Sequence, residues 1–150
     1  MTPSSISEWR KFEIKFREAA ARVGLRGHLL DMCVAMAAHE SRVGPRDAQR
    51  PTSLARDYCN PFGIKYNQPS DEGRYGYVVM KDNQFDGGPL PTETYRVYPS
   101  LESAAENWLR HINNSYHYRK AIHDLIRGVY AVWAPTDPSA AADTIKIFEE

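Results

Sequence analysis

Neither sign of charge predominates in this chain, because lysine plus arginine and aspartate plus glutamate each number 19. Proteins that bind nucleic acid usually carry a basic surplus, so we expect no nucleic-acid partner. The chain also lacks a run of about 18 apolar residues, which a membrane-spanning helix needs. Residues 1–5 have neither the basic nor the apolar region of a signal peptide. We therefore expect a soluble chain with no membrane partner.

Cysteine is scarce, with Cys33 and Cys59 the only two. They permit one disulfide or none, and a bridge would close about 25 residues for roughly 3 kcal/mol. Sequence leaves both alternatives open. Neither cysteine is spaced for metal or redox work, and His39-Glu40 begins like a zinc-protease motif but has Val43 in place of the second histidine. With no glycine-rich phosphate loop either, we expect no metal and no cofactor.

Hydrophobic residues make up 42% of the 150 residues and charged residues 25%. This composition and length predict a single globular domain that spans residues 1–150. Apolar residues recur at spacings of three and four, and capping residues flank these stretches. Two stretches rich in β-branched and aromatic residues flank a turn-forming segment and predict an antiparallel hairpin. The fold class is therefore mainly α (α+β). The expected helices are 7–23, 26–43, 100–112, 117–127 and 137–148, with a short helical turn at 53–58, and the hairpin strands are 74–82 and 93–98 around residues 86–89.

The second expected helix, 26–43, is apolar around most of its circumference, which predicts a buried central helix. Its last turn carries Glu40, on the line of Cys33 and Met36. Desolvation on such a stripe raises the pKa of a carboxyl group, so that it can still donate a proton near neutral pH. Glu40 is therefore a candidate general acid. The alternative is a last-turn glutamate that reaches water or pairs with a nearby arginine.

Few residues in the sequence are candidates for catalysis or ligand binding. No serine lies in a Gly-x-Ser-x-Gly elbow, and what remains is Glu40, a polar segment at 44–73, carboxylates in the hairpin and many aromatic residues. This inventory suits a glycosidase, which needs a protonated acid at the scissile oxygen, often a second carboxylate, and aromatic faces for sugar rings. Trp9 and Trp108, at helical spacing, are better explained as core residues.

Four segments match the residue types of a known family and occur in its order. They are Ala37-Ala38-His39-Glu40-Ser41, Asn60-Pro61-Phe62-Gly63-Ile64-Lys65, residues 95–103 and Trp133-Ala134-Pro135-Thr136-Asp137-Pro138. Together they resemble the glucosaminidase family of peptidoglycan hydrolases, which includes flagellar and autolysin N-acetylglucosaminidases. The resemblance implies a lysozyme-like helical domain with a small antiparallel hairpin lobe. It also implies endo-β-N-acetylglucosaminidase activity on the glycan strands of bacterial peptidoglycan.

The resemblance assigns the catalytic acid to Glu40. Family members usually place a second glutamate on the strand that leads into the hairpin turn, and no glutamate stands there in this chain. Asp82 is nearest to that position and takes the second catalytic role, with Asp86 and Glu93 as fallbacks. Asp82 could instead initiate the turn.

The same resemblance assigns substrate binding to Asn60 and Phe62 of the second segment and to Tyr130 and Trp133 near the fourth. A tyrosine of the family stands where this chain has Trp133. An indole cannot replace a phenolic hydroxyl, so either Tyr130 takes over that role or the role is absent.

Several alternatives stay open at this point. A second carboxylate roughly 6.5 to 9.5 Å from the acid would leave room for an attacking water molecule and imply inversion of the anomeric configuration. Without a second carboxylate, the acetamido oxygen of the substrate could act as the nucleophile, or an anhydro product could form. A lytic transglycosylase or muramidase uses a similar helix-end Glu-Ser pair. A non-catalytic wall-binding or virion module would explain the missing hairpin glutamate. We expect a monomer that is secreted, acts at the cell wall, or is encoded by a phage as an endolysin.

Overall fold

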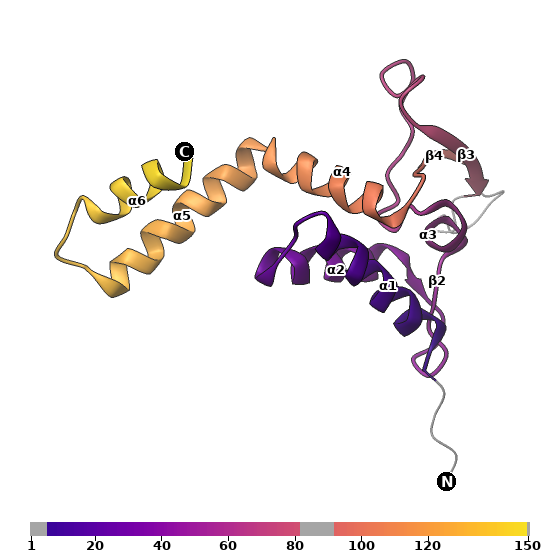
Figure 1. Cartoon of the computed structure of the whole chain (residues 1–150), viewed down its shortest axis with the longest axis horizontal. Coiled ribbons are helices and arrows are strands. Elements are labelled where there is room, and N and C mark those ends of the chain that lie inside the picture. Colours follow the sequence, from indigo (N-terminus) through magenta and orange to yellow (C-terminus); the bar gives the residue numbers. More distant parts are fainter. Residues whose placement is uncertain (1–5, 82–91, 150) are drawn as a thin grey trace, which may run out of the picture. The chain divides into compact units, whose positions relative to one another are not determined.

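The computed structural model describes residues 6–81 and 92–149. It is mainly α-helical with short antiparallel strands, which confirms the expected fold class (Figure 1). The chain divides after Trp108 into two compact units, each described by itself, and the single domain expected over 1–150 stays a prediction. The elements are α1 (Glu8–Arg22), α2 (Gly27–Ser41), β1 (Arg42–Val43), β2 (Arg50–Pro51), α3 (Ser53–Tyr58), β3 (Gly76–Lys81), β4 (Thr92–Val97), α4 (Leu101–Asn113), α5 (Tyr116–Trp133) and α6 (Ala140–Glu149).

Helix α1 begins and ends where its capping residues predict. The Ser7 side chain accepts a hydrogen bond from the Arg10 N–H at 3.1 Å. At the other end Gly24 has a φ of 102°, a conformation that glycine adopts without a side-chain clash. The Leu25 N–H then reaches back to the Ala20 carbonyl at 3.1 Å, which completes a Schellman cap.

A row of aromatic rings forms the core of the first unit. Trp9, Phe12 and Phe16 of α1 are buried, with ring centroids 5.4 and 6.3 Å apart along the row. Phe62 continues it, 5.7 Å from Phe16 and 6.2 Å from Trp108 of α4. The expected core positions of Trp9 and Trp108 are confirmed. The segment around Phe62 therefore joins α1 to α4 through its own side chain.

Helix α2 is buried along one side only, so the expectation of a buried central helix is wrong. Cys33 and Ala37 are fully buried, whereas Met32 and Met36 are 45% and 41% exposed. Methionine and alanine are compatible with either environment, and the even spread of apolar residues around α2 hid the side that packs. Cys33 and Cys59 are both free thiols, and burial raises the pKa of Cys33 to about 12.

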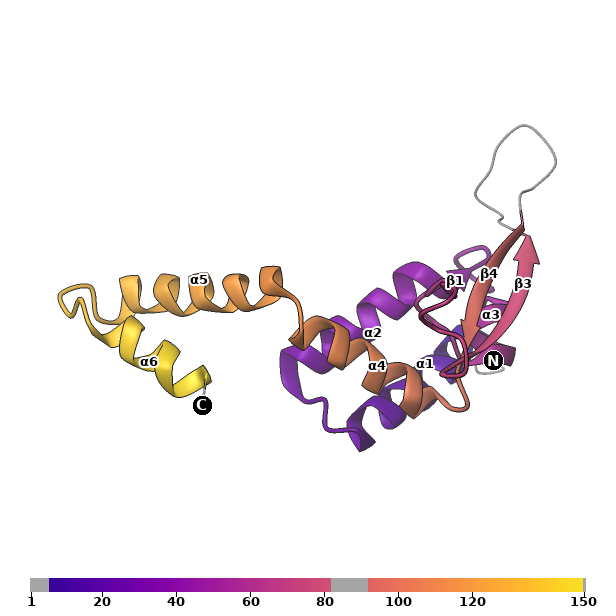
Figure 2. The same ribbon diagram turned by 90° about the horizontal axis from the view of Figure 1, so that it is seen from above.

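The expected hairpin is confirmed as β3 and β4, which pair antiparallel from Gly76 opposite Val97 to Lys81 opposite Thr92 (Figure 2). The expected turn at residues 86–89 lies outside the described residues. On its other edge β4 bonds the segment 64–66, because the Tyr66 N–H donates to the Thr94 carbonyl at 2.9 Å. The Asn-Pro-Phe-Gly-Ile-Lys segment is thus attached both to the core and to the hairpin.

In the second unit α5 runs through Gly128 to Trp133, so the expected helix end at Gly128 is wrong. A glycine inside a helix costs only about 1 kcal/mol relative to alanine, and the apolar spacing continues beyond it. Packing against α6 also supports this part of α5, because Thr144 Oγ1 donates to the Tyr130 hydroxyl at 2.9 Å.

The aromatic row predicts a large stability effect at Phe62. Phe62→Ala should lower the free energy of unfolding by about 3 kcal/mol, since the cavity would remove contacts to both α1 and α4. Urea unfolding at pH 7 measures this. Tyr77→Ala is the matched control, because Tyr77 is 61% exposed on β3 and should cost less than about 1 kcal/mol. Equal losses in the two variants would contradict the assignment of Phe62 to the core.

Candidate functional site

Glu40 lies in the last turn of α2, one residue before the helix ends at Ser41. It is exposed and continues the row of Met32 and Met36 at four-residue spacing. The buried row of α2 runs instead through Cys33 and Ser41. The burial expected for Glu40 is therefore wrong, and the carboxyl group is open to water and to any ligand at this helix end.

The backbone beside Glu40 is firmly held. Ser41 is 1% exposed, and its hydroxyl donates to the Ala37 carbonyl at 2.6 Å. The Ser41 carbonyl accepts a hydrogen bond from the Thr52 N–H at 2.8 Å. Among residues 6–81 and 92–149, Glu40 itself has no hydrogen-bond or ion-pair partner. The arrangement thus presents a free carboxyl group on a fixed helix end.

The hairpin holds the candidates for a second carboxylate. Asp82 and Asp86 lie outside the described residues, and β3 ends at Lys81, directly before Asp82. Glu93 on β4 is half-buried and forms an ion pair with Lys65, with 3.3 Å between Oε1 and Nζ. The structure therefore shows a partner for Glu93, and the role of Asp82 stays a prediction.

Asn60 is 1% exposed, and each of its side-chain bonds is made within the protein. Its Nδ2 donates to the carbonyls of Ile64 and Arg96, both at 2.9 Å, and its Oδ1 accepts from the Ile64 N–H at 3.1 Å. A buried amide with these partners has little capacity left for a sugar. Sugar contact by Asn60 and Phe62 stays a prediction, and their burial favours a role in positioning the loop.

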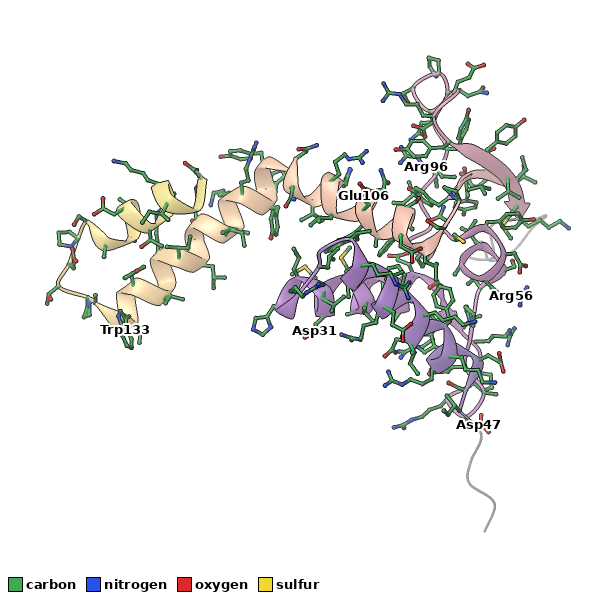
Figure 3. The ribbon with its side chains drawn as sticks, in the orientation of Figure 1. Asp31, Asp47, Arg56, Arg96, Glu106 and Trp133 are labelled. Atoms are coloured by element: carbon green, nitrogen blue, oxygen red, sulfur yellow. The ribbon has the colours of Figure 1, made fainter. Side chains whose placement is uncertain are left out.

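Sequence reasoning missed a highly connected polar group of the first unit, the Arg96 guanidinium (Figure 3). Its Nε and Nη2 donate to both carboxylate oxygens of Asp71, at 2.9 and 3.0 Å, and its Cζ lies 4.2 Å from the centroid of the Tyr75 ring. Its Nη1 donates to Asn107 Oδ1 at 3.1 Å, and the Tyr98 hydroxyl donates to the same oxygen at 2.6 Å. Loop, hairpin and α4 meet here. Nothing in the sequence pairs Asp71 with Arg96, which lie 25 positions apart.

The hydrogen bonds from Arg96 hold the pKa of Asp71 below its usual range. Asp71 is 4% exposed, so its charge is stabilised mainly by this partner. The ion pair is therefore a part of the scaffold whose strength depends on pH.

Tyr130 and Trp133 belong to the second unit. Trp133 is 82% exposed at the end of α5 and presents an indole to solvent (Figure 3). The Tyr130 hydroxyl is half-buried and accepts the hydrogen bond from Thr144, although its own proton remains free to be donated. Trp133 is thus the more accessible of the two for stacking on a sugar ring.

No cluster of three or more histidine, cysteine, aspartate or glutamate residues that could hold a metal ion occurs within residues 6–81 and 92–149. Over the same residues, the structure contains no helix whose length and hydrophobicity would let it cross a membrane.

Residues 14–150 match the model of the glucosaminidase family, described as mannosyl-glycoprotein endo-β-N-acetylglucosaminidase. No curated protein matches the sequence. The solved structures with a similar course of the chain include a peptidoglycan hydrolase from Sphingomonas sp. A1 (21% identity, 93% of this chain and 87% of that chain, TM-score 0.48) and a mutant peptidoglycan hydrolase from the same organism (21%, 93%, 92%, 0.45). A C-terminally truncated glycoside hydrolase domain of Salmonella typhimurium FlgJ is similar at 17% identity, over 93% of this chain and 96% of that chain, with a TM-score of 0.46. All three TM-scores are below 0.5, so the assignment of this chain to a family rests on the match over residues 14–150.

The Asp71–Arg96 pair predicts a pH-dependent contribution to stability. Because the pKa of Asp71 is lower in the folded chain than the usual value of about 3.9, the pair stabilises the fold above about pH 4. That contribution is lost as the pH falls through the lowered pKa. Asp71→Asn should cost about 3 kcal/mol at pH 7, because it leaves the Arg96 charge without a carboxylate.

Urea unfolding of the wild type and of Asp71→Asn between pH 2 and pH 7 measures the effect. The difference between their free energies of unfolding should narrow toward pH 2. Asp31→Asn is the control, since its ion pair with Arg17 is exposed and should matter little. A gap that stayed constant over this range would show that Asp71 does not act through its charge.

Proposed function

This chain belongs to the glucosaminidase family, and on that basis we propose that it is a peptidoglycan hydrolase that cleaves the β-1,4 bond after N-acetylglucosamine. Glu40 acts as the general acid. The observation that supports this most is the family match over residues 14–150, within which an unpartnered carboxyl group lies on a fixed helix end. The family description names a mannosyl-glycoprotein, so peptidoglycan as the substrate rests on the resemblance of the four sequence segments.

In this proposal Glu40 protonates the glycosidic oxygen as the bond to it breaks. An exposed carboxyl group can meet a large polymer directly, whereas a buried one would need the protein to open. A glycan strand bound over Glu40 excludes water from the carboxyl group, which the free protein leaves open to solvent. Ser41 keeps the helix end in place by its bonds to Ala37 and Thr52, so that little ordering remains for the bound state.

We assign the second catalytic role to Asp82, which follows the last residue of β3. Asp82 comes directly after six consecutive residue pairs of β3 and β4, the last of which is Lys81 opposite Thr92. Glu93 is the weaker candidate, since Lys65 holds its carboxylate. If the carboxyl groups of Asp82 and Glu40 lie roughly 6.5 to 9.5 Å apart, a water molecule fits between them and attacks the sugar, and the anomeric configuration is inverted in the product.

Trp133 contributes a stacking surface for a sugar ring, and Tyr130 offers a hydroxyl proton. Asn60 and Phe62, which the resemblance assigns to substrate binding, act by fixing the segment 60–66 against β4 and the aromatic row. The proposed place of action is the bacterial cell wall, where the polymer is found.

Replacement of the acid should strongly slow turnover while the fold is kept. Glu40→Gln should lower kcat by at least about 100-fold, because general acid catalysis contributes roughly that much or more. Release of soluble fragments from purified cell walls measures the rate. Glu72→Gln is the matched control, since Glu72 is also exposed but lies in the loop before β3. Lysis by Glu40→Gln at the wild-type rate would end the assignment.

The bond that is cleaved can be read from the products. Mass spectrometry of digested walls should show fragments with reducing N-acetylglucosamine ends. Anhydromuramyl ends would identify a lytic transglycosylase, and reducing N-acetylmuramic acid ends a muramidase. Release of sugar from a mannosyl glycoprotein but not from walls would shift the substrate to the one in the family description.

A non-catalytic wall-binding or virion module is the second candidate, because the expected hairpin glutamate is absent from the sequence. In that case the wild-type chain would bind purified walls but release no fragments, and Glu40→Gln would bind equally well.

A further inference from the structure

The first unit has a cleft that none of the proposed catalytic residues lines. Its volume is about 310 Å³, and α1, β2 and α3 form its walls. Glu8, Lys11 and Lys15 project from one face of α1, since they follow each other at spacings of three and four. Arg50 and Arg56 line the opposite side, and Figure 3 marks Arg56 on α3.

The residues that line this cleft carry more positive than negative charge, although the whole chain is neutral. Four cationic side chains and one acidic side chain line it. Glu8 pairs with Lys11 at 3.0 Å, and Arg56 pairs with the neighbouring Asp57 at 2.9 Å. Lys15 and Arg50 have no acidic partner within the described parts of the chain. The cleft therefore attracts an anion.

The floor of the cleft is apolar. Phe12 is 8% exposed, and Pro51 and Ala55 are buried beside it. Cys59 also lines the floor, and desolvation together with the charge of Glu102 raises the pKa of its thiol. A neutral thiol presents apolar surface and does not repel an anion. The cleft thus suits a ligand that combines carboxylates with small apolar groups.

The cleft is connected to the catalytic helix end. An adjoining hollow of about 340 Å³ shares Arg50 and Arg56 with it and reaches Val43. Val43 lies opposite Arg50 in the β1–β2 pair and three residues after Glu40, a chain distance of at most about 11 Å. A branch of a polymer bound at Glu40 is therefore within reach of Arg50.

We propose that this cleft binds the short peptides that branch from the glycan strands of peptidoglycan. The inference rests on the proposed function for its substrate. Wall peptides carry free carboxylates on a backbone rich in alanine methyl groups, which matches a cationic rim over an apolar floor. Arg50 can take a carboxylate through two parallel N–H bonds, and Lys15 supplies a second charge. A phosphate polymer of the wall would match the rim but would leave the floor uncovered.

The test measures binding without cleavage, so that it is independent of the catalytic proposal. Isothermal titration of the full chain with the tetrapeptide released from peptidoglycan should show binding. The double substitution Lys15→Glu with Arg50→Glu should raise Kd at least about tenfold, since each exposed ion pair contributes modestly and reversal adds repulsion. Blocking the carboxylates of the tetrapeptide as amides should weaken binding to the wild type by a similar factor.

Arg119→Glu with Lys146→Glu is the matched control, because both residues are exposed in the second unit and the change in net charge is the same. It should bind like the wild type. If the double variant does not fold, Lys15→Glu alone should still raise Kd about threefold, since Lys15 is exposed on α1.

The inference would be overturned by no binding of the tetrapeptide, by equal binding of its amide form, or by an equal loss in the control variant. Tighter binding of a glycerol-phosphate oligomer than of the tetrapeptide would also overturn it, in favour of a phosphate polymer. If the wild-type chain binds the tetrapeptide but does not cleave walls, that result counts against the catalytic proposal alone.

Discussion

The buried amide of Asn60 is the constraint on which the first unit depends. It bonds the backbone of Ile64 on one side and of Arg96 on the other, and so fixes the loop that carries Phe62 to β4. Phe62 can then enter the aromatic row between α1 and α4, while the Arg96 side chain reaches Asp71. Loss of one buried amide would leave several backbone groups without partners, which is more costly than loss of a surface contact.

This scaffold places an exposed acid on a rigid support. Glu40 has open surroundings, yet Ser41 next to it is buried and bonded on both sides. Such an arrangement suits a polymeric substrate, because the polymer can reach the acid without a change in the fold and can exclude water once it is bound. The cationic cleft beyond Arg50 suits the same kind of substrate, because a branched polymer has charged groups on its branches as well as glycosidic bonds in its main strand.

Much of the fold follows from local patterns in the chain. The caps of α1, the strands of the hairpin and the core positions of Trp9 and Trp108 were predictable, because each depends on neighbouring residues. The end of α5 and the exposed side of α2 were not. Gly128 weakens a helix only slightly, so α5 continues through it, and contacts with α6 support this part of the helix. For α2, apolar residues on most sides concealed which row would face α1.

The candidate site divides in the same way. Sequence by itself determined the residue types and their order, which is why Glu40 followed by Ser41 and the segment from Asn60 to Lys65 pointed to a glycosidase. Only the tertiary structure decided that Glu40 is exposed, that Asn60 and Phe62 are buried, and that Asp71 pairs with Arg96. Burial and ion pairing depend on which distant segments meet, and that information is absent from the local spacing of residues.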